Sequence, residues 1–368
     1  MAQSPQYRHE VPGRTAVLLI NLGTPEAPTP TAVRRYLREF LSDPRVVEIP
    51  RPVWWPILYG LVLPFRPRAS AAKYAKVWTD KGSPLLVHSQ QQALLLRGYL
   101  GERGIDADVI LAMRYGEPSI AAALRTLVER RAERVLILPM YPQYSATTTA
   151  SALDALFAGF AQIRNLPEVR WVKHFHDHPG YIEALRQSVV QHWARHGRAQ
   201  DRGGKLVMSF HGVPERTLRL GDPYHCECRK TARLLAESLA LAGENYIVTF
   251  QSRFGRAKWL EPYTAPTLQA LARSGTTAVD VICPGFPADC LETLEEIAIE
   301  ARATFIEAGG REFSYVPCLN DAPAFISALV DIAAEHMHGW PVERSMMDNR
   351  VEQAEKSRAR ARLLGADS

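Results

Sequence analysis

The chain of 368 residues has few cysteines and no long apolar run. Its five cysteines are an odd number without the spacing of a disulfide framework. A chain of this length can bury a core without cross-links, so we expect reduced thiols and a cytoplasmic protein. The longest apolar stretch, 53–65, is interrupted by Pro56 and Pro64. A membrane-spanning helix needs ~20 apolar residues, so the sequence predicts no span.

A large excess of one sign of charge is also absent, since the positive and negative residues nearly balance and the net charge is only +5. This excess is too small for a typical nucleic-acid-binding protein, so we expect no nucleic acid partner. Residues 1–14 are polar and lack the apolar core of a signal peptide, which predicts a polar N-terminal arm. Residues 341–368 carry both signs of charge, including KSRARAR, and predict a solvated, partly disordered tail. Nothing in the sequence indicates the oligomeric state.

Short apolar runs alternate with amphipathic helical segments along the rest of the chain. Helices are expected over 83–101, 118–132, 179–196 and 322–338. Strands are expected over Ala16–Asn21, Val109–Met113, Val135–Pro139, Val169–Phe175, Leu206–Phe210, Ile247–Phe250, Val279–Cys283 and Phe313–Val316.

This alternation predicts an α/β fold of two Rossmann-like, doubly wound domains, each with a four-stranded parallel sheet flanked by helices. The long insertion over 43–81 argues against one closed eight-stranded barrel. We expect an N-terminal domain over 15–175 and a C-terminal domain over 176–340. In such folds ligands bind beyond the carboxyl ends of the strands.

Two strand ends carry residues suited to chemistry. His211 directly follows an apolar strand, and a neutral imidazole there can bind a divalent metal or act as a general base. After the strand over 279–283, Glu292, Glu296 and Glu300 recur at a spacing of four residues, which places them on one face of an α-helix. Such carboxylates can conduct a hydrated dication or accept protons, although solvated acidic helix faces are common.

The motifs around these residues resemble those of the ferrochelatase family. The sequence SFHGVP contains His211 and is followed by GDPY. Further matching segments follow in the family's order: LLINLGTPE at 18–26, YPQYSATTTAS at 141–151, FQSRFGRAKWLEPYT at 250–264 and PGFPADCLETLEE at 284–296. The resemblance covers residues 15–335 and implies a chelatase-like fold that inserts ferrous iron into protoporphyrin IX, the last step of haem biosynthesis.

The resemblance also implies roles for individual residues. It places His211 and Glu292 at the porphyrin centre, as metal ligands or proton acceptors, with Glu296 and Glu300 on a path for metal or protons. It makes residues 53–65 an apolar lip at the porphyrin entrance, which could contact the inner face of the cell membrane peripherally. The porphyrin-binding residues it implies are Trp54, Trp55, Arg66, Tyr74, Ser83, Arg114, Tyr115 and Trp259.

Ferrous iron is then a substrate, and no permanently bound cofactor or iron–sulphur cluster is expected. Clustered relatives use cysteines near the C-terminus, whereas no cysteine follows Cys318 here. Cys226 and Cys228 form a C-x-C pair that does not complete a metal site alone, so we interpret them as thiols at a loop or helix start. Cys290 stands where relatives often have histidine, which leaves the role of that position open.

Other functions are compatible with these residues. A coproporphyrin ferrochelatase is a close variant whose substrate differs in the number of propionates, although the apolar lip favours the more apolar protoporphyrin. A non-catalytic porphyrin or haem carrier, or a cobalt or nickel chelatase, could share the fold. Finally, His174, His176 and His178 alternate after a predicted strand, and we interpret them as a solvated loop rather than a metal site.

Overall fold

The computed structural model describes residues 13–255, 257–343 and 347–366. Most of the expected N-terminal arm, residues 1–12, lies outside the described residues, and Arg14 already belongs to the first strand. None of the described helices combines the length and hydropathy that a bilayer-spanning segment requires.

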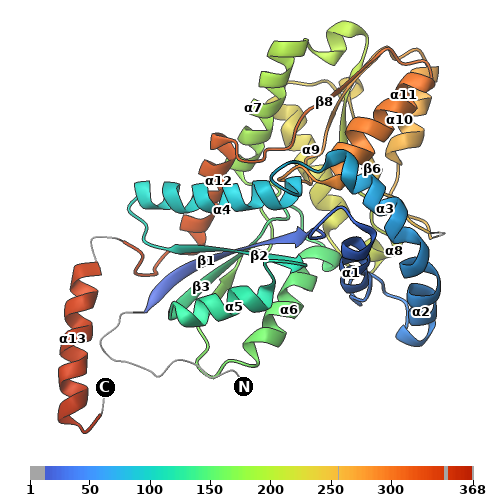
Figure 1. Cartoon of the computed structure of the whole chain (residues 1–368). Helices are drawn as coiled ribbons and strands as arrows, with labels where there is room; N and C mark the ends of the chain where they lie inside the picture. The colour runs from blue at the N-terminus through green and yellow to red at the C-terminus, as the bar shows by residue number, and fades with distance from the viewer. Residues whose placement is uncertain (1–12, 256, 344–346, 367–368) are drawn as a thin grey trace.

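The strands form two parallel sheets of four (Figure 1). The first has the order β2-β1-β3-β4 and the second β6-β5-β7-β8, so both sheets have the same winding. The bounds are β1 Arg14–Gly23, β2 Asp108–Tyr115, β3 Ala132–Pro139, β4 Glu168–Trp171, β5 Lys205–His211, β6 Tyr246–Gln251, β7 Ala278–Ile282 and β8 Glu312–Tyr315. The predicted fold class is therefore confirmed.

Helices connect the strands. The α-helices are α1 Pro30–Leu41, α2 Arg51–Ile57, α3 Leu63–Val77, α4 Pro84–Glu102, α5 Ile120–Glu129, α6 Ser151–Phe160, α7 Pro179–His196, α8 Glu215–Arg219, α9 Tyr224–Ser238, α10 Thr264–Arg273, α11 Arg302–Glu307, α12 Pro323–His336 and α13 Met347–Leu363. Three segments are π-helical, η1 Leu58–Val62, η2 Ala146–Ala150 and η5 Glu292–Ala301, and η3 Ala199–Arg202 and η4 Gly243–Asn245 are 3₁₀ turns.

Alternate residues of each strand enter opposite cores, as the period of two requires. In β1, Leu18 packs in one cluster with α5 and α6, while Leu19 packs on the other face with α4 and α12 (Figure 1). The second sheet likewise buries Val207 against α10, η5 and α11, and Met208 against α9. Both faces of both sheets are covered, which explains the continuous apolar runs of the strands.

One hydrophobic core joins the two halves. The cluster that contains Leu19 of the first sheet also contains Met208 of the second, together with residues of α7 and α12. Helix α12 follows the second sheet but packs against α4 beside the first. The two sheets are therefore held against each other by buried apolar contacts, which fix the relative positions of their strand ends.

The apolar lip is part of an uninterrupted helical segment, since α2, η1 and α3 follow one another directly. Trp55 is 46% exposed and Phe65 is 72% exposed. Trp54, in contrast, is buried, and its indole N–H donates to the carbonyl oxygen of Leu41 at 2.7 Å. The expectation that both tryptophans face a ligand therefore fails for Trp54, because neighbouring residues of a helix point to different sides.

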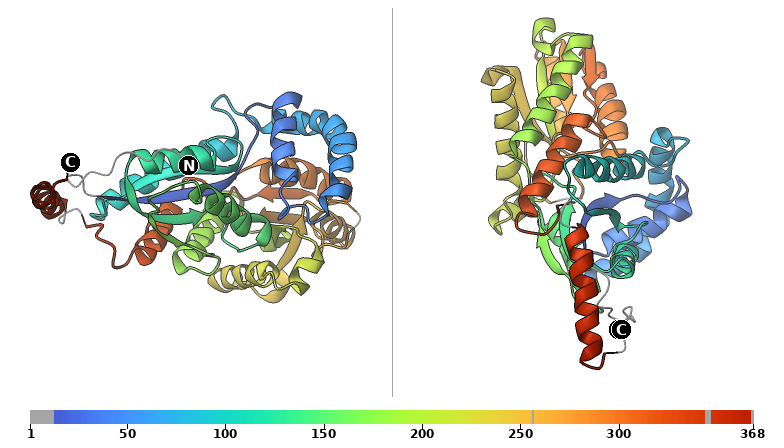
Figure 2. Two further views of the ribbon diagram at one scale, coloured as in Figure 1. Left: turned by 90° about the horizontal axis from the view of Figure 1, so that it is seen from below. Right: turned by 90° about the vertical axis from the view of Figure 1, so that its left-hand side faces the viewer.

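The C-terminal tail is also more ordered than the sequence analysis predicts. Residues 347–363 form helix α13, which projects from the body of the molecule (Figure 2). The segment is rich in Ala, Glu and Arg, which favour helix, and the ion pair between Glu352 and Lys356 has the stabilising i,i+4 spacing. The mixed charges favour a solvated segment, and the helix propensity of its residues makes that segment a helix where disorder was expected.

Candidate active site

The site lies where neighbouring strands of the second sheet end. His211 is the last residue of β5, which pairs with β7, and β7 leads through a short loop to η5, whose first residue is Glu292. Because the chain crosses back over β5 to form β7, their carboxyl ends flank the point where the winding reverses. This is the position at which doubly wound sheets bind ligands.

Hydrogen bonds orient the imidazole of His211. Its Nδ1 lies 2.6 Å from the carbonyl oxygen of Gly212, which can only accept, so Nδ1 carries the proton. The lone pair is then on Nε2, to which no described residue donates a hydrogen bond. Tyr224 of α9 donates its hydroxyl to the carbonyl oxygen of His211 at 2.9 Å and fixes the end of the strand. His211 therefore presents a free nitrogen that can take a proton or bind a metal.

Gly212 allows an aromatic ring to pack beside this histidine. A Cβ at position 212 would lie 2.7 Å from the carbonyl oxygen of Gln251 and 3.1 Å from the ring of Trp259. No side chain fits there, so the glycine lets Trp259 approach the backbone next to His211. The ring of Trp259 therefore packs beside the residue that follows His211.

The acidic segment is wound more widely than the α-helix that its spacing suggests. Residues Glu292–Ala301 form a π-helix with i→i+5 hydrogen bonding. A turn of roughly four to five residues keeps residues four apart on one side, so it does not break the predicted line of Glu292, Glu296 and Glu300. It also brings Glu295 and Glu300, which are five apart, to neighbouring positions, where Lys73 of α3 contacts both, at 3.0 and 2.6 Å. Glu300 is thus part of an ion-pair cluster with α3, and its place on a path for metal or protons stays a prediction.

Glu295 was missed by the sequence analysis, yet it is the most buried of these glutamates. It is 1% exposed and contacts Lys73 and also Lys76, at 2.9 Å. Burial raises the pKa of Glu295, but the two ammonium groups outweigh that effect and hold it below its usual value. Helix α3, which continues the lip, is therefore anchored to η5 by charge.

Glu296 remains at the centre and organises the end of β6. Its carboxylate accepts from the backbone N–H of Ser252 at 2.7 Å and from the Ser252 hydroxyl. Ser252 has a φ of 65°, a left-handed conformation that costs about 1–3 kcal/mol in a residue other than glycine. Burial raises the pKa of Glu296, although hydrogen bonds from Ser252 and the nearby His211 oppose this. The charge of Glu292 raises it further, so His211, Glu292 and Glu296 form one centre.

Two predicted porphyrin contacts reach this centre from α3. The guanidinium of Arg66 stacks over the ring of Phe254, with its central carbon 4.8 Å from the ring centroid. Desolvation lowers the pKa of Arg66, and Tyr74 and Glu292 act on it in the opposite direction. Burial, followed by the charge of Glu292, raises the pKa of Tyr74. Arg66 and Tyr74 therefore lie near Glu292, at the junction between the lip and the second sheet.

The other predicted contacts are more deeply placed. Ser83 is buried and accepts a hydrogen bond from Thr24 at 2.8 Å, just beyond β1. Tyr115 is fully buried, and with Arg114 and Ser151 it binds the carboxylate of Asp43. These residues form a hydrogen-bonded network behind the site, so Tyr115 supports the site from the core and does not line its surface. Asp43 and Ser151 were not singled out from the sequence.

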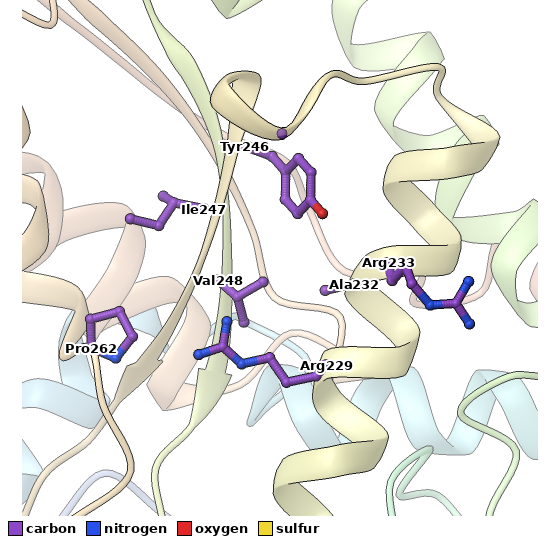
Figure 3. Close-up of a pocket in the computed structure, with 8 residues that line it drawn as sticks. Arg229, Ala232, Arg233, Tyr246, Ile247, Val248 and Pro262 are labelled. Atoms are coloured by element: carbon purple, nitrogen blue, oxygen red, sulfur yellow. The ribbon is translucent and has the colours of Figure 1, made fainter.

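Two cavities differ in size and place. One of about 620 Å³ lies beside α1 and is lined by Tyr36, Tyr59 and Arg114 among others. The pKa of Tyr36 is raised chiefly by burial, and then by Tyr74 and the charge of Glu292. The other, of about 290 Å³, lies between α9 and β6 beside Arg229 and Arg233 (Figure 3), and none of its lining residues belongs to the centre.

The cysteines do not gather around the centre as a set. Cys226 and Cys228 lie near the start of α9, the first exposed and the second buried, so they point to different sides. This agrees with their interpretation as thiols at a helix start. Cys290 is buried next to the centre, and burial raises the pKa of its thiol.

The fold is that of chelatases. SirB of Bacillus subtilis, solved with Fe³⁺, superposes with a TM-score of 0.51 at 12% identity, covering 90% of this chain and 99% of that one. DR2241 of Deinococcus radiodurans, described as structurally similar to chelatases, superposes with a TM-score of 0.51 at 15% identity, covering 88% and 55%. At these identities the likeness shows the fold alone.

Sequence comparison defines the family. The model of the ferrochelatase family matches residues 14–337. A ferrochelatase of Janthinobacterium sp. (strain Marseille) is 60% identical over 99% of this chain and 98% of its own length, and one of Polaromonas sp. (strain JS666) is 59% identical over 99% of both. The chain belongs to the ferrochelatase family, and it is an enzyme that inserts iron into a porphyrin for haem synthesis.

The raised pKa of Glu296 predicts a specific pH dependence of stability. The folded protein holds this proton more tightly than the unfolded chain, whose glutamate pKa is ~4.3, so the charged carboxylate destabilises the fold as pH rises. Relative to the wild type, Glu296→Gln should therefore gain free energy of unfolding as pH rises above about 4, until the raised pKa is passed. Denaturant unfolding across this range measures the difference.

Glu295→Gln serves as the control of opposite sign. Its lowered pKa means that the charged form stabilises the fold, so this variant should lose free energy of unfolding relative to the wild type as pH rises toward about 4.3. A pH-independent difference for Glu296→Gln would show that Glu296 is not held in a desolvating environment.

Proposed function

We propose that the porphyrin is protoporphyrin IX and that His211 and Glu292 act on it directly. The observation that supports this most is the free Nε2 of His211, held at a strand end beside two carboxylates. Insertion of Fe²⁺ releases two protons from the pyrrole nitrogens. An oriented neutral imidazole can accept one of them, and a carboxylate can accept the other or bind the incoming metal.

Glu296 is proposed as a positioning residue. Both of its oxygens already accept hydrogen bonds from Ser252, so it is less free than Glu292 to bind Fe²⁺. It lies close enough to His211 and Glu292 to influence their charge. A proton leaving the centre could pass to it, because burial raises its pKa and makes it a better acceptor than an exposed glutamate.

The remaining contacts are proposed from position and chemistry. Arg66 offers a guanidinium that pairs well with a propionate carboxylate, and Tyr74 interacts with it electrostatically. Ser83, which binds Thr24, is proposed as a further contact. Trp259 and the cavity beside Tyr36 and Tyr59 provide aromatic surface for a flat ring. We also propose that the enzyme holds no iron–sulphur cluster and is cytoplasmic.

The choice of porphyrin follows from the lip. Its exposed side chains Val53, Trp55, Tyr59, Leu61 and Phe65 are apolar or aromatic, which favours protoporphyrin over the more highly carboxylated coproporphyrin. Purified enzyme given Fe²⁺ anaerobically should metallate protoporphyrin IX with a higher kcat/KM than coproporphyrin. A preference for coproporphyrin would refute this assignment and leave family membership unaffected.

Substitution of the central residues should separate chemistry from binding. His211→Ala and Glu292→Gln should each lower kcat by ~10²–10⁴-fold, because each removes a proton acceptor, while porphyrin still binds by fluorescence titration. Glu300→Gln is the matched control, since Glu300 binds Lys73 and should leave kcat near the wild-type value. Near-normal turnover by His211→Ala would contradict the assignment.

We further propose that the lip contacts the membrane surface peripherally. Trp55→Ala combined with Phe65→Ala should weaken liposome binding and raise the KM for protoporphyrin, while the free energy of unfolding changes by only ~0.5 kcal/mol. Trp54→Ala is the buried counterpart and should cost about 3–5 kcal/mol of stability. Unchanged liposome binding by the double variant would exclude the lip as the membrane contact.

A further inference from the structure

A cluster of two histidines and a glutamate lies outside the reaction centre. His174 and His176 belong to the segment between β4 and α7, which connects the first sheet to the second half of the chain. Glu227 lies in the first turn of α9. One ligand atom from each residue lies within 4.8 Å of the other two. The cluster thus joins the linking segment to a helix of the second half.

The distances within the cluster are short. Nδ1 of His174 lies 2.6 Å from one oxygen of Glu227, and Nδ1 of His176 lies 3.5 Å from the other. The imidazole rings of His174 and His176 meet edge to face, with centroids 4.8 Å apart. Two imidazole nitrogens and a carboxylate thus converge on one small region, and the set His₂Glu binds divalent transition metals such as Zn²⁺ in proteins.

Protein hydrogen bonds leave one member of the cluster unsatisfied. His176 is 4% exposed, yet its Nδ1 has no hydrogen-bond partner among the described residues. A buried nitrogen without a hydrogen-bond partner is unfavourable, and an ion bound by both this nitrogen and the Glu227 carboxylate, 3.5 Å away, would satisfy it.

The surroundings hold the three side chains in place. Thr231 of α9 donates its hydroxyl to the carbonyl oxygen of His176 at 2.8 Å, and Lys230 contacts Asp177. The backbone N–H of Tyr144, in the loop after β3, donates to Glu227 at 2.7 Å. Such contacts orient metal ligands in proteins. They also connect the first half of the chain to α9, which carries Tyr224 and so bonds to the backbone of His211.

We propose that His174, His176 and Glu227 bind a divalent transition-metal ion that ties the linking segment to α9. A fourth position remains for water, as in other His₂Glu sites. The ion would replace the hydrogen bond between His174 and Glu227 and supply a partner for His176. This site is distinct from the reaction centre, so it does not depend on the proposed porphyrin chemistry.

Zinc binding tests this proposal directly. Metal-free full-length protein carrying His211→Ala, which removes the main imidazole of the reaction centre, is titrated with Zn²⁺ by calorimetry. One tight equivalent per chain is expected, with a rise in Tm when Zn²⁺ is added. Absence of tight binding in this variant, when the wild type binds Zn²⁺, would assign the metal to the reaction centre and overturn the proposal.

Variants within the same motif identify the ligands. In the same background, His176→Ala or Glu227→Gln should weaken Zn²⁺ binding by at least ~10–100-fold, the loss seen when even the supporting contacts of a metal site are disturbed. His178→Ala is the matched control, since His178 belongs to the same alternating motif but lies near Glu335 instead. Equal weakening by His178→Ala would overturn the assignment.

X-ray absorption at the zinc edge identifies the ligands without any substitution in the cluster itself. The bound ion in the His211→Ala protein should show imidazole nitrogen and oxygen ligands without sulphur. A sulphur ligand would indicate Cys226, the exposed neighbour of Glu227, and would overturn the proposed ligand set.

Discussion

The site depends most on the π-helical winding of residues 292–301. In this segment the wide turn lets Glu295 and Glu300, five residues apart, both reach Lys73 of α3, while Glu296 binds Ser252 at the end of β6. Acidic side chains of this segment therefore have two roles. Glu295 and Glu300 bind the lip helix to the second half, and Glu296 lies near His211. π-Helical segments are rare and occur often at functional sites, which agrees with this division.

The charge contact between α3 and η5 also explains how parts distant in sequence form one site. Helix α3 carries Arg66 and Tyr74 from the N-terminal half, and its lysines bind η5 of the C-terminal half. The shared core of α7 and α12 holds the two sheets together behind this contact. With both ends fixed, a flat ligand would meet Arg66 from one half and His211 from the other without a large rearrangement.

Features that depend only on residues close together in the sequence could be predicted from it. Apolar runs located all eight strands, and His211 was found because it follows one of them directly. The winding of η5 was not predictable, since the spacing of Glu292, Glu296 and Glu300 also fits an α-helix. Contacts between residues far apart in the sequence could not be predicted either. Only folding brings Glu227 to His174 and His176. The sequence therefore predicted a solvated loop for these histidines, whereas His176 is buried.

We propose that His211 and Glu292 meet a porphyrin between the two halves while Glu300 stays bound to α3. A crystal structure of the enzyme with metal-free protoporphyrin IX tests it most directly. We expect the ring centre to lie between Nε2 of His211 and the carboxylate of Glu292, with the contact between Glu300 and Lys73 intact. A ring bound away from His211, or a Glu300 turned toward the ring in line with Glu292 and Glu296, would contradict this account.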